Sequence, residues 1–168
     1  MLGKDKRSGR ALAPGMGRVM RARGRWSDGF CHVDELDLIS EKRGLFGANV
    51  YLRVPQGGSD IGRESTQKQV FTEPPAGGIE IFPVSVSSRW DFYRNAYTLS
   101  NLLSQNEEGQ HRLRAVLPKP VYVAPEAGDL LILCSQRPHA VVGFDTGERV
   151  SVQTFLTHTK GEAIRMDC

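Results

Sequence analysis

The chain has 168 residues, of which 39% are hydrophobic and 24% are charged, and its formal net charge is +3. A single domain of this size buries roughly 68–70% of the surface of its unfolded chain, so we expect one hydrophobic core. No apolar run approaches the length of a membrane span, and basic and aromatic residues do not alternate beyond the N-terminal segment, so neither a membrane nor a nucleic acid is expected as partner.

The N-terminal segment, residues 1–25, is rich in arginine, lysine and glycine and nearly lacks large apolar side chains. Such a segment contributes little to a core, and we expect a disordered basic tail. An organelle transit peptide is the alternative, since these peptides are also arginine-rich. Asp5 and the glycines argue against it, and a cytoplasmic location is expected.

The three cysteines, Cys31, Cys134 and Cys168, include no closely spaced pair. This pattern predicts free thiols in a reducing compartment, and neither a disulfide framework nor a zinc knuckle. We expect Cys31 and Cys134 to be small buried groups.

After the tail, residues 29–34 have the alternation of a strand, with His32 and Asp34 two positions apart and therefore on the same face. Asp37 is the competing carboxylate, but its odd offset from His32 places it on the other face. Residues 48–55 are a second predicted strand.

Residues 56–78 are polar and have a Gly-Gly pair at each end. Without them, the strand at 48–55 would run directly into another strand at 79–84. We therefore interpret 56–78 as a loop inserted into a hairpin connection, which a protein surface tolerates at modest entropic cost.

Residues 88–105 carry apolar side chains at helical spacing. The aromatic residues of this segment are Trp90, Phe92, Tyr93 and Tyr97. They are expected to cover the core, and a lid over a substrate entrance is the alternative. The segment 106–114 is interpreted as a polar connection, and strands are expected near 121–123 and 130–135.

The segment 137–155 contains two apolar runs joined by a glycine turn, with His139 in the first and Arg149 in the second. We interpret the runs as adjacent antiparallel strands that hold the imidazole and the guanidinium about one strand-width apart. An imidazole can bind a metal, and a guanidinium can bind a carboxylate through two hydrogen bonds.

Many short strands with one helical interruption predict a mainly β fold, a sandwich or a barrel. We expect one domain over residues 26–160, followed by a short tail at 161–168. Taken singly, His139 is typical of a hydrogen-bonded core histidine and Arg149 of a solvated strand charge. His111 and His158 lack candidate partners and are expected to be structural or to face solvent.

Two histidines and one carboxylate, His32, Asp34 and His139, together match the facial triad of non-haem Fe(II) oxygenases, which leaves coordination positions open. Arg149 follows ten residues after His139, where it could neutralise a carboxylate on a cosubstrate of the same metal.

With these residues in order, the sequence resembles the Fe(II)/2-oxoglutarate-dependent dioxygenase superfamily, in its prolyl-hydroxylase-like and free-standing small-molecule forms. The resemblance covers about residues 29–156 and rests on these segments: His32-Val33-Asp34, 48–55 with the following Gly-Gly, AGDLLIL, RPHAV and GERVSVQTF. The family implies a double-stranded β-helix, or jelly-roll, core.

The resemblance implies that three residues bind Fe(II): His32, Asp34 and His139. It also implies that Arg149 binds the distal carboxylate of 2-oxoglutarate, with Ser151 as a hydrogen-bonding neighbour and with Asn49 and Tyr51 as inward-facing contacts. In such enzymes O2 and 2-oxoglutarate yield succinate and CO2 while a C–H bond is hydroxylated. Halogenating relatives lack the carboxylate ligand, so Asp34 favours hydroxylation.

Two substrate classes remain open, a small molecule and a peptidyl side chain. The oligomeric state is not predicted. Family members carry more structure before the His-x-Asp motif than the short segment here, so an N-terminally truncated oxygenase is one interpretation. The alternative from another functional class is a jelly-roll protein that binds ligands without catalysing a reaction. A cupin-type metal isomerase is the third, and it would have no use for Arg149.

Overall fold

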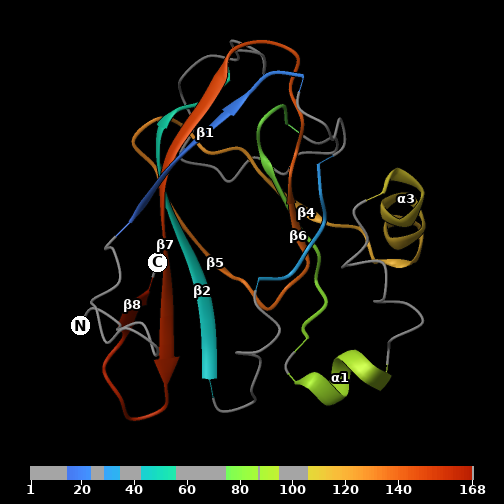
Figure 1. Cartoon of the computed structure of the whole chain (residues 1–168), viewed down its shortest axis with the longest axis vertical. Helices are drawn as coiled ribbons and strands as arrows, with labels where there is room; N and C mark the ends of the chain where they lie inside the picture. The colour runs from blue at the N-terminus through green and yellow to red at the C-terminus, as the bar shows by residue number, and fades with distance from the viewer. Residues whose placement is uncertain are drawn as a thin grey trace.

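The structure is a computed structural model that describes residues 15–23, 29–34, 43–55, 75–86, 88–94 and 106–167. Within these ranges the chain is mainly β, with two antiparallel sheets and the helices α1 and α3 (Figure 1). The arrangement is that of a β-sandwich and is consistent with a jelly-roll core, which confirms the predicted fold class.

The larger sheet has five strands, arranged around the long strand β7. Its path is β1 (Met16–Arg21), β7 (Glu148–Thr159), β2 (Arg43–Arg53) and β5 (Leu130–Cys134), and β8 (Arg165–Asp167) also pairs with β7. β1 pairs with residues 148–153 of β7 and β8 with residues 155–157. These two short strands therefore follow one another along β7, opposite the side where β2 pairs.

The smaller sheet has the order β4 (Val121–Val123), β3 (Ile79–Ile81) and β6 (His139–Val141). His32 forms an isolated antiparallel bridge with His139, so the segment 29–34 lies along the outer edge of β6. The two sheets pack on each other where Tyr51 and Leu133 of the larger sheet meet Ile79 of the smaller one.

Helices α1 (Arg89–Arg94) and α3 (Glu107–Val116) lie between β3 and β4 in sequence. A helix was predicted at the position of α1, but α3 replaces an expected polar connection, and that prediction was wrong. The side-chain oxygen of Asn106 accepts a hydrogen bond from the Gly109 N–H and caps α3, and Leu113 is buried. With one large apolar side chain facing the core, the helix gives only a weak periodic signal.

Two strands occur in segments predicted to be tails. β1 lies within residues 1–25 and β8 within residues 161–168, so the expectation of disorder was wrong for Met16–Arg21. The side chains of β1 are exposed along its whole length. Pairing with β7 uses backbone groups, which hydropathy does not register. Residues 1–14 and 24–28 lie outside the described part.

The predicted hairpin between β2 and β3 is wrong because the two strands belong to different sheets: β2 pairs with β5 and β7, whereas β3 pairs with β4 and β6. The predicted insertion lies mostly outside the described residues, which resume at Pro75.

Trp90 is 69% exposed and Tyr93 is 66% exposed, so the prediction that these two side chains cover the core is wrong. Tyr97 lies outside the described residues. Among the helices that the structure describes, none is both long and apolar enough to cross a membrane.

Candidate metal and carboxylate site

His32 and His139 are brought together by their backbones. The His32 N–H donates to the His139 carbonyl at 3.0 Å, and the His139 N–H donates to the His32 carbonyl at 2.9 Å. Residues that exchange both hydrogen bonds in an antiparallel pair project their side chains to the same face. The two imidazole rings accordingly lie 4.6 Å apart, centroid to centroid.

Asp34 joins the two histidines because it follows His32 by two positions along an extended segment. Its N–H donates to the Ser135 carbonyl at 3.1 Å, which holds the segment beside the chain entering β6. Asp34 Oδ1 lies 3.7 Å from His32 Nε2, and Asp34 Oδ2 lies 3.6 Å from His139 Nε2. One ligand atom from each of the three residues lies within 4.8 Å of the others.

Both imidazoles are oriented with Nε2 toward this cluster. His32 Nδ1 lies 2.8 Å from the Phe30 carbonyl oxygen, and His139 Nδ1 lies 2.9 Å from the Arg137 carbonyl oxygen. A carbonyl can only accept, so each Nδ1 carries the proton and each Nε2 presents a lone pair. This second hydrogen bond is the arrangement that fixes the tautomer of metal-binding histidines.

The electrostatics of the cluster favour the metal-binding forms. Burial lowers the pKa of His139, and the neighbouring His32 lowers it further while Asp34 opposes both, so the imidazole of His139 is neutral at physiological pH. Among the described residues, Asp34 Oδ2 is buried and has no hydrogen-bond partner. A buried carboxylate oxygen without a partner is costly unless a cation satisfies it. Two imidazoles and this carboxylate fit a divalent transition metal.

Arg149 is the second unusual group of the interior, since its guanidinium is buried with the whole residue only 4% exposed. Its Nη2 donates to the Tyr51 hydroxyl at 3.0 Å, its Nη1 donates to the Gly77 carbonyl at 3.4 Å, and its Nε is buried without a partner. The guanidinium carbon lies 4.9 Å from the centre of the Tyr51 ring.

Burial lowers the pKa of Arg149 below its ordinary value, and Tyr51 opposes this shift. Arginine nevertheless remains charged in proteins at neutral pH. No carboxylate among the described residues forms an ion pair with Arg149. A buried, incompletely satisfied cation of this kind is suited to bind an anion.

The residues predicted to surround Arg149 lie on the same interior face of the larger sheet. Tyr51 pairs with Ser151 and Asn49 pairs with Gln153 across β2 and β7, and all four are buried. The prediction that Asn49 and Tyr51 face inward is therefore confirmed.

The expected placement of His139 and Arg149 on adjacent strands was wrong. β6 belongs to the smaller sheet and β7 to the larger one, so the chain crosses from one sheet to the other between them. Arg149 reaches toward the smaller sheet through Gly77, which lies just before β3, the neighbour of β6. The glycine turn had suggested a hairpin, and sequence alternation does not distinguish a hairpin from a crossing between two sheets.

The remaining candidates agree with expectation where the structure describes them, except that Cys134 is less buried than predicted. Cys31 is fully buried and burial raises the pKa of its thiol to about 12, whereas Cys134 is only half-buried. His111 and His158 are exposed. Asp37 and Cys168 lie outside the described residues.

The fold and the cluster together define a β-sandwich with a candidate His-Asp-His metal site. Two solved structures from Burkholderia ambifaria AMMD are similar in fold, both of an N-substituted L-amino acid dioxygenase. The first has 14% sequence identity and a TM-score of 0.54, and the match covers 94% of this chain and 54% of that one. The second, in complex with alpha-KG, has 15% identity and a TM-score of 0.50, with 92% and 52% covered.

The chain thus spans about half the length of these neighbours, and at such identity the likeness shows the fold alone. No protein-family model matches the sequence, and no curated protein matches it significantly.

Proposed function

We propose that the protein is an Fe(II)- and 2-oxoglutarate-dependent oxygenase that hydroxylates a C–H bond of a small molecule or a peptidyl side chain, with release of succinate and CO2. The observation that carries the proposal is the convergence of His32, Asp34 and His139 around a buried carboxylate oxygen that has no hydrogen-bond partner in the described part of the chain. The dioxygenase neighbours, one of them in complex with alpha-KG, support the same kind of chemistry.

Under this proposal His32 Nε2, Asp34 and His139 Nε2 bind the iron, and the other coordination positions are available to cosubstrate and O2. Bound iron supplies the oxidising chemistry, which no amino-acid side chain provides. The carbonyls of Phe30 and Arg137 keep the two imidazoles in the ligand tautomer.

Arg149 binds the distal carboxylate of 2-oxoglutarate in the proposed complex. A carboxylate can accept hydrogen bonds from the unpartnered Nε and from a terminal nitrogen of the same guanidinium. Ser151, two positions along β7 on the same face, and Tyr51 and Asn49 on β2 offer further polar contacts. Because the site is buried, this ion pair forms in a medium of low dielectric constant and is correspondingly strong.

The test is oxygen-dependent formation of succinate from 2-oxoglutarate after anaerobic loading with Fe(II). N-substituted L-amino acids, the substrate class named for the neighbours, are the first compounds to add as substrates. We expect succinate to require both Fe(II) and O2. Binding of metal and 2-oxoglutarate without any succinate would favour the non-catalytic binding protein.

The variant Arg149→Ala separates the oxygenase from a metal isomerase. We expect it to retain Fe(II) and to lose at least about 30-fold in affinity for 2-oxoglutarate, since breaking a buried charge pair costs about 2–5 kcal/mol. Isothermal titration under nitrogen measures both affinities. An unchanged affinity for 2-oxoglutarate would refute the role of Arg149.

A further inference from the structure

The segment 29–34 supplies two of the three proposed metal ligands but belongs to none of the named strands. On one side it is held by β6 and the preceding turn, through the paired backbones of His32 and His139 and the bond from Asp34 to Ser135. In an extended chain, successive residues direct their backbone groups to opposite sides. The N–H and C=O of Cys31 therefore point away from β6.

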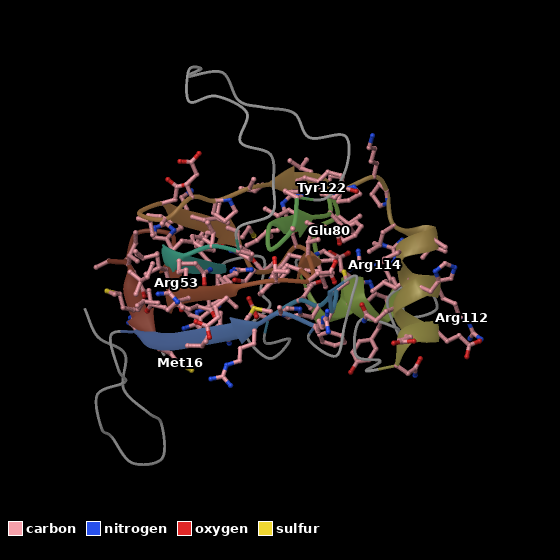
Figure 2. The ribbon with its side chains drawn as sticks, turned by 90° about the horizontal axis from the view of Figure 1, so that it is seen from above. Met16, Arg53, Glu80, Arg112, Arg114 and Tyr122 are labelled. Atoms are coloured by element: carbon pink, nitrogen blue, oxygen red, sulfur yellow. The ribbon has the colours of Figure 1, made fainter. Side chains whose placement is uncertain are left out.

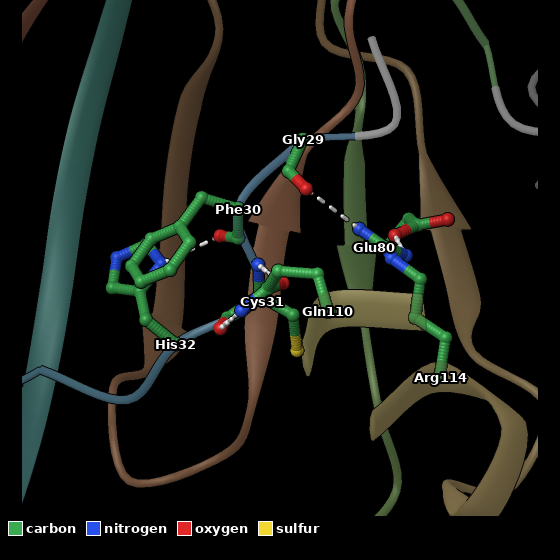
Figure 3. A network of polar contacts seen from close by, with 7 residues as sticks. All are labelled: Gly29, Phe30, Cys31, His32, Glu80, Gln110 and Arg114. Carbon is green, nitrogen blue, oxygen red and sulfur yellow. Dashed lines mark hydrogen bonds and ion pairs between the residues drawn. The ribbon is translucent and has the colours of Figure 1, made fainter. Parts of the chain in front are cut away.

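On that opposite side the side chain of Gln110 from α3 takes the place of a neighbouring strand (Figure 3). The Cys31 N–H donates to Gln110 Oε1 at 2.7 Å, and Gln110 Nε2 donates to the Cys31 carbonyl at 3.2 Å. A carboxamide carries an acceptor oxygen and an NH₂ donor on neighbouring atoms, so one side chain satisfies both backbone groups. Gln110 itself is only 4% exposed.

Arg114, one turn further along α3, fixes the entry to the same segment. Its Nη2 donates to the Gly29 carbonyl at 3.2 Å, and its Nη1 forms an ion pair with Glu80 of β3. Seen from above, Arg114 points from the helix toward Glu80 whereas Arg112 points outward (Figure 2). Gly29 has a φ of +76°, and a Cβ there would lie 1.9 Å from the Val141 carbonyl oxygen, so the entry is closely packed against β6 as well.

We propose that α3 positions the metal centre, with Gln110 as the positioning residue that keeps residues 29–34 in register beside β6. The inference rests on the proposed metal site. Beside β6 the segment is held by one two-residue bridge and by the bond from Asp34 to Ser135, and loss of the contact from Gln110 would leave two buried backbone groups of Cys31 without partners among the described residues. If this segment is displaced, His32 and Asp34 move relative to His139, although none of the three ligand residues has been substituted.

The test uses Co(II) as the probe, with its affinity measured by titration and its coordination by visible absorption. The variant Gln110→Leu keeps the side-chain size and removes both hydrogen bonds, and we expect roughly 10- to 100-fold weaker Co(II) binding, the range for lost partners outside the ligand shell. Gln110→Glu retains the acceptor for the Cys31 N–H and should give an intermediate loss. Arg112→Leu, on the exposed side of α3, is the matched control and should bind Co(II) as the wild type does.

A second readout needs no metal: hydrogen exchange of the Cys31 amide in the metal-free chain, with Leu113→Ala as a control for general loss of stability. We expect Gln110→Leu to accelerate exchange at Cys31 selectively, whereas Leu113→Ala should accelerate many amides together. Wild-type Co(II) affinity in folded Gln110→Leu overturns the inference. If the wild type itself binds no Co(II), the proposed function fails, and exchange at Cys31 alone then decides whether Gln110 holds the segment.

Discussion

Two regions of the interior differ in kind. Beneath α3, apolar side chains form one buried cluster beside the buried polar residues Gln110 and Glu80; its members are Cys31, Val33, Phe82, Val86, Leu113 and Ala140. On the inner face of the larger sheet, many buried side chains are polar: Asn49, Arg149, Ser151, Gln153 and Thr157. Apolar burial stabilises a fold, whereas burial of polar groups costs free energy unless they find partners. The comparison suggests that the first region supports the metal ligands and that the second is built to bind an anion.

The outer face of the larger sheet contrasts with its polar inner face. Large apolar side chains are exposed there: Val50, Leu52, Leu130, Ile132 and Val152. In residues 49–52 of β2 and 149–153 of β7 the polar side chains thus face inward and the apolar ones outward, the reverse of an ordinary sheet with one solvated face. Under the proposed function, this inward polar face is where the charged cosubstrate binds.

The largest effect should follow from Asp34→Ala, which removes the central ligand of the cluster. We expect Co(II) affinity to fall by at least about 1,000-fold, more than loss of an outer hydrogen bond costs. The metal-free variant should be as stable as the wild type or more so, because a buried oxygen without a partner has been removed. Titration and urea denaturation measure the two quantities. Metal binding at wild-type affinity would show that the cluster is not the site.

Leu113→Ala tests the apolar region. Leu113 is fully buried in the cluster beneath α3, so we expect the free energy of unfolding to fall by about 2–5 kcal/mol. In the fraction that remains folded, Co(II) affinity should change much less than it does in Asp34→Ala. Val116→Ala, at an exposed position of the same helix, is the matched control. A loss below about 1 kcal/mol would mean that α3 contributes little to the core.

Tyr51→Phe tests the polar region without changing its shape. The variant removes the hydroxyl that accepts from Arg149 Nη2, so we expect a loss of about 1–3 kcal/mol in the free energy of unfolding. Bound 2-oxoglutarate should recover part of this loss by satisfying the guanidinium. Thermal denaturation with and without 2-oxoglutarate measures the effect, and Tyr93→Phe at an exposed position should be neutral.

The smallest effect concerns Cys31. Burial raises the pKa of its thiol from 9.0 to about 12. Above pH 9.0 the unfolded chain releases this proton while the folded chain retains it, so stability falls as pH rises toward 12 and is unaffected below 9.0. By about pH 9.5 the loss should be roughly 0.8 kcal/mol. Cys31→Ala should lack this part of the pH dependence, and an identical profile would show that the thiol ionises freely in the folded chain.

Local spacing grouped two residues of the candidate site, His32 and Asp34, and the match to a facial triad added His139. The spacing of His32 and Asp34 places both on one face of any extended segment, wherever that segment lies. Alternation along residues 148–153 placed Arg149 and Ser151 on one face and Val150 and Val152 on the other. It did not predict which of the two faces is buried. The resemblance to oxygenases predicted that the polar face of β2, with Asn49 and Tyr51, points inward. The ordinary rule that apolar residues are buried would have predicted the opposite face.

By itself, the sequence determined the mainly β class, the approximate positions of most of the long strands and the residues able to form a metal site, because these depend on side-chain type and on periods of two. Only the tertiary structure decided that β6 and β7 lie in different sheets, that β1 pairs along β7, and that α3 holds the segment 29–34 through Gln110. These features depend on backbone hydrogen bonds and on contacts between residues as far apart as 31 and 110, which leave no periodic trace in the chain.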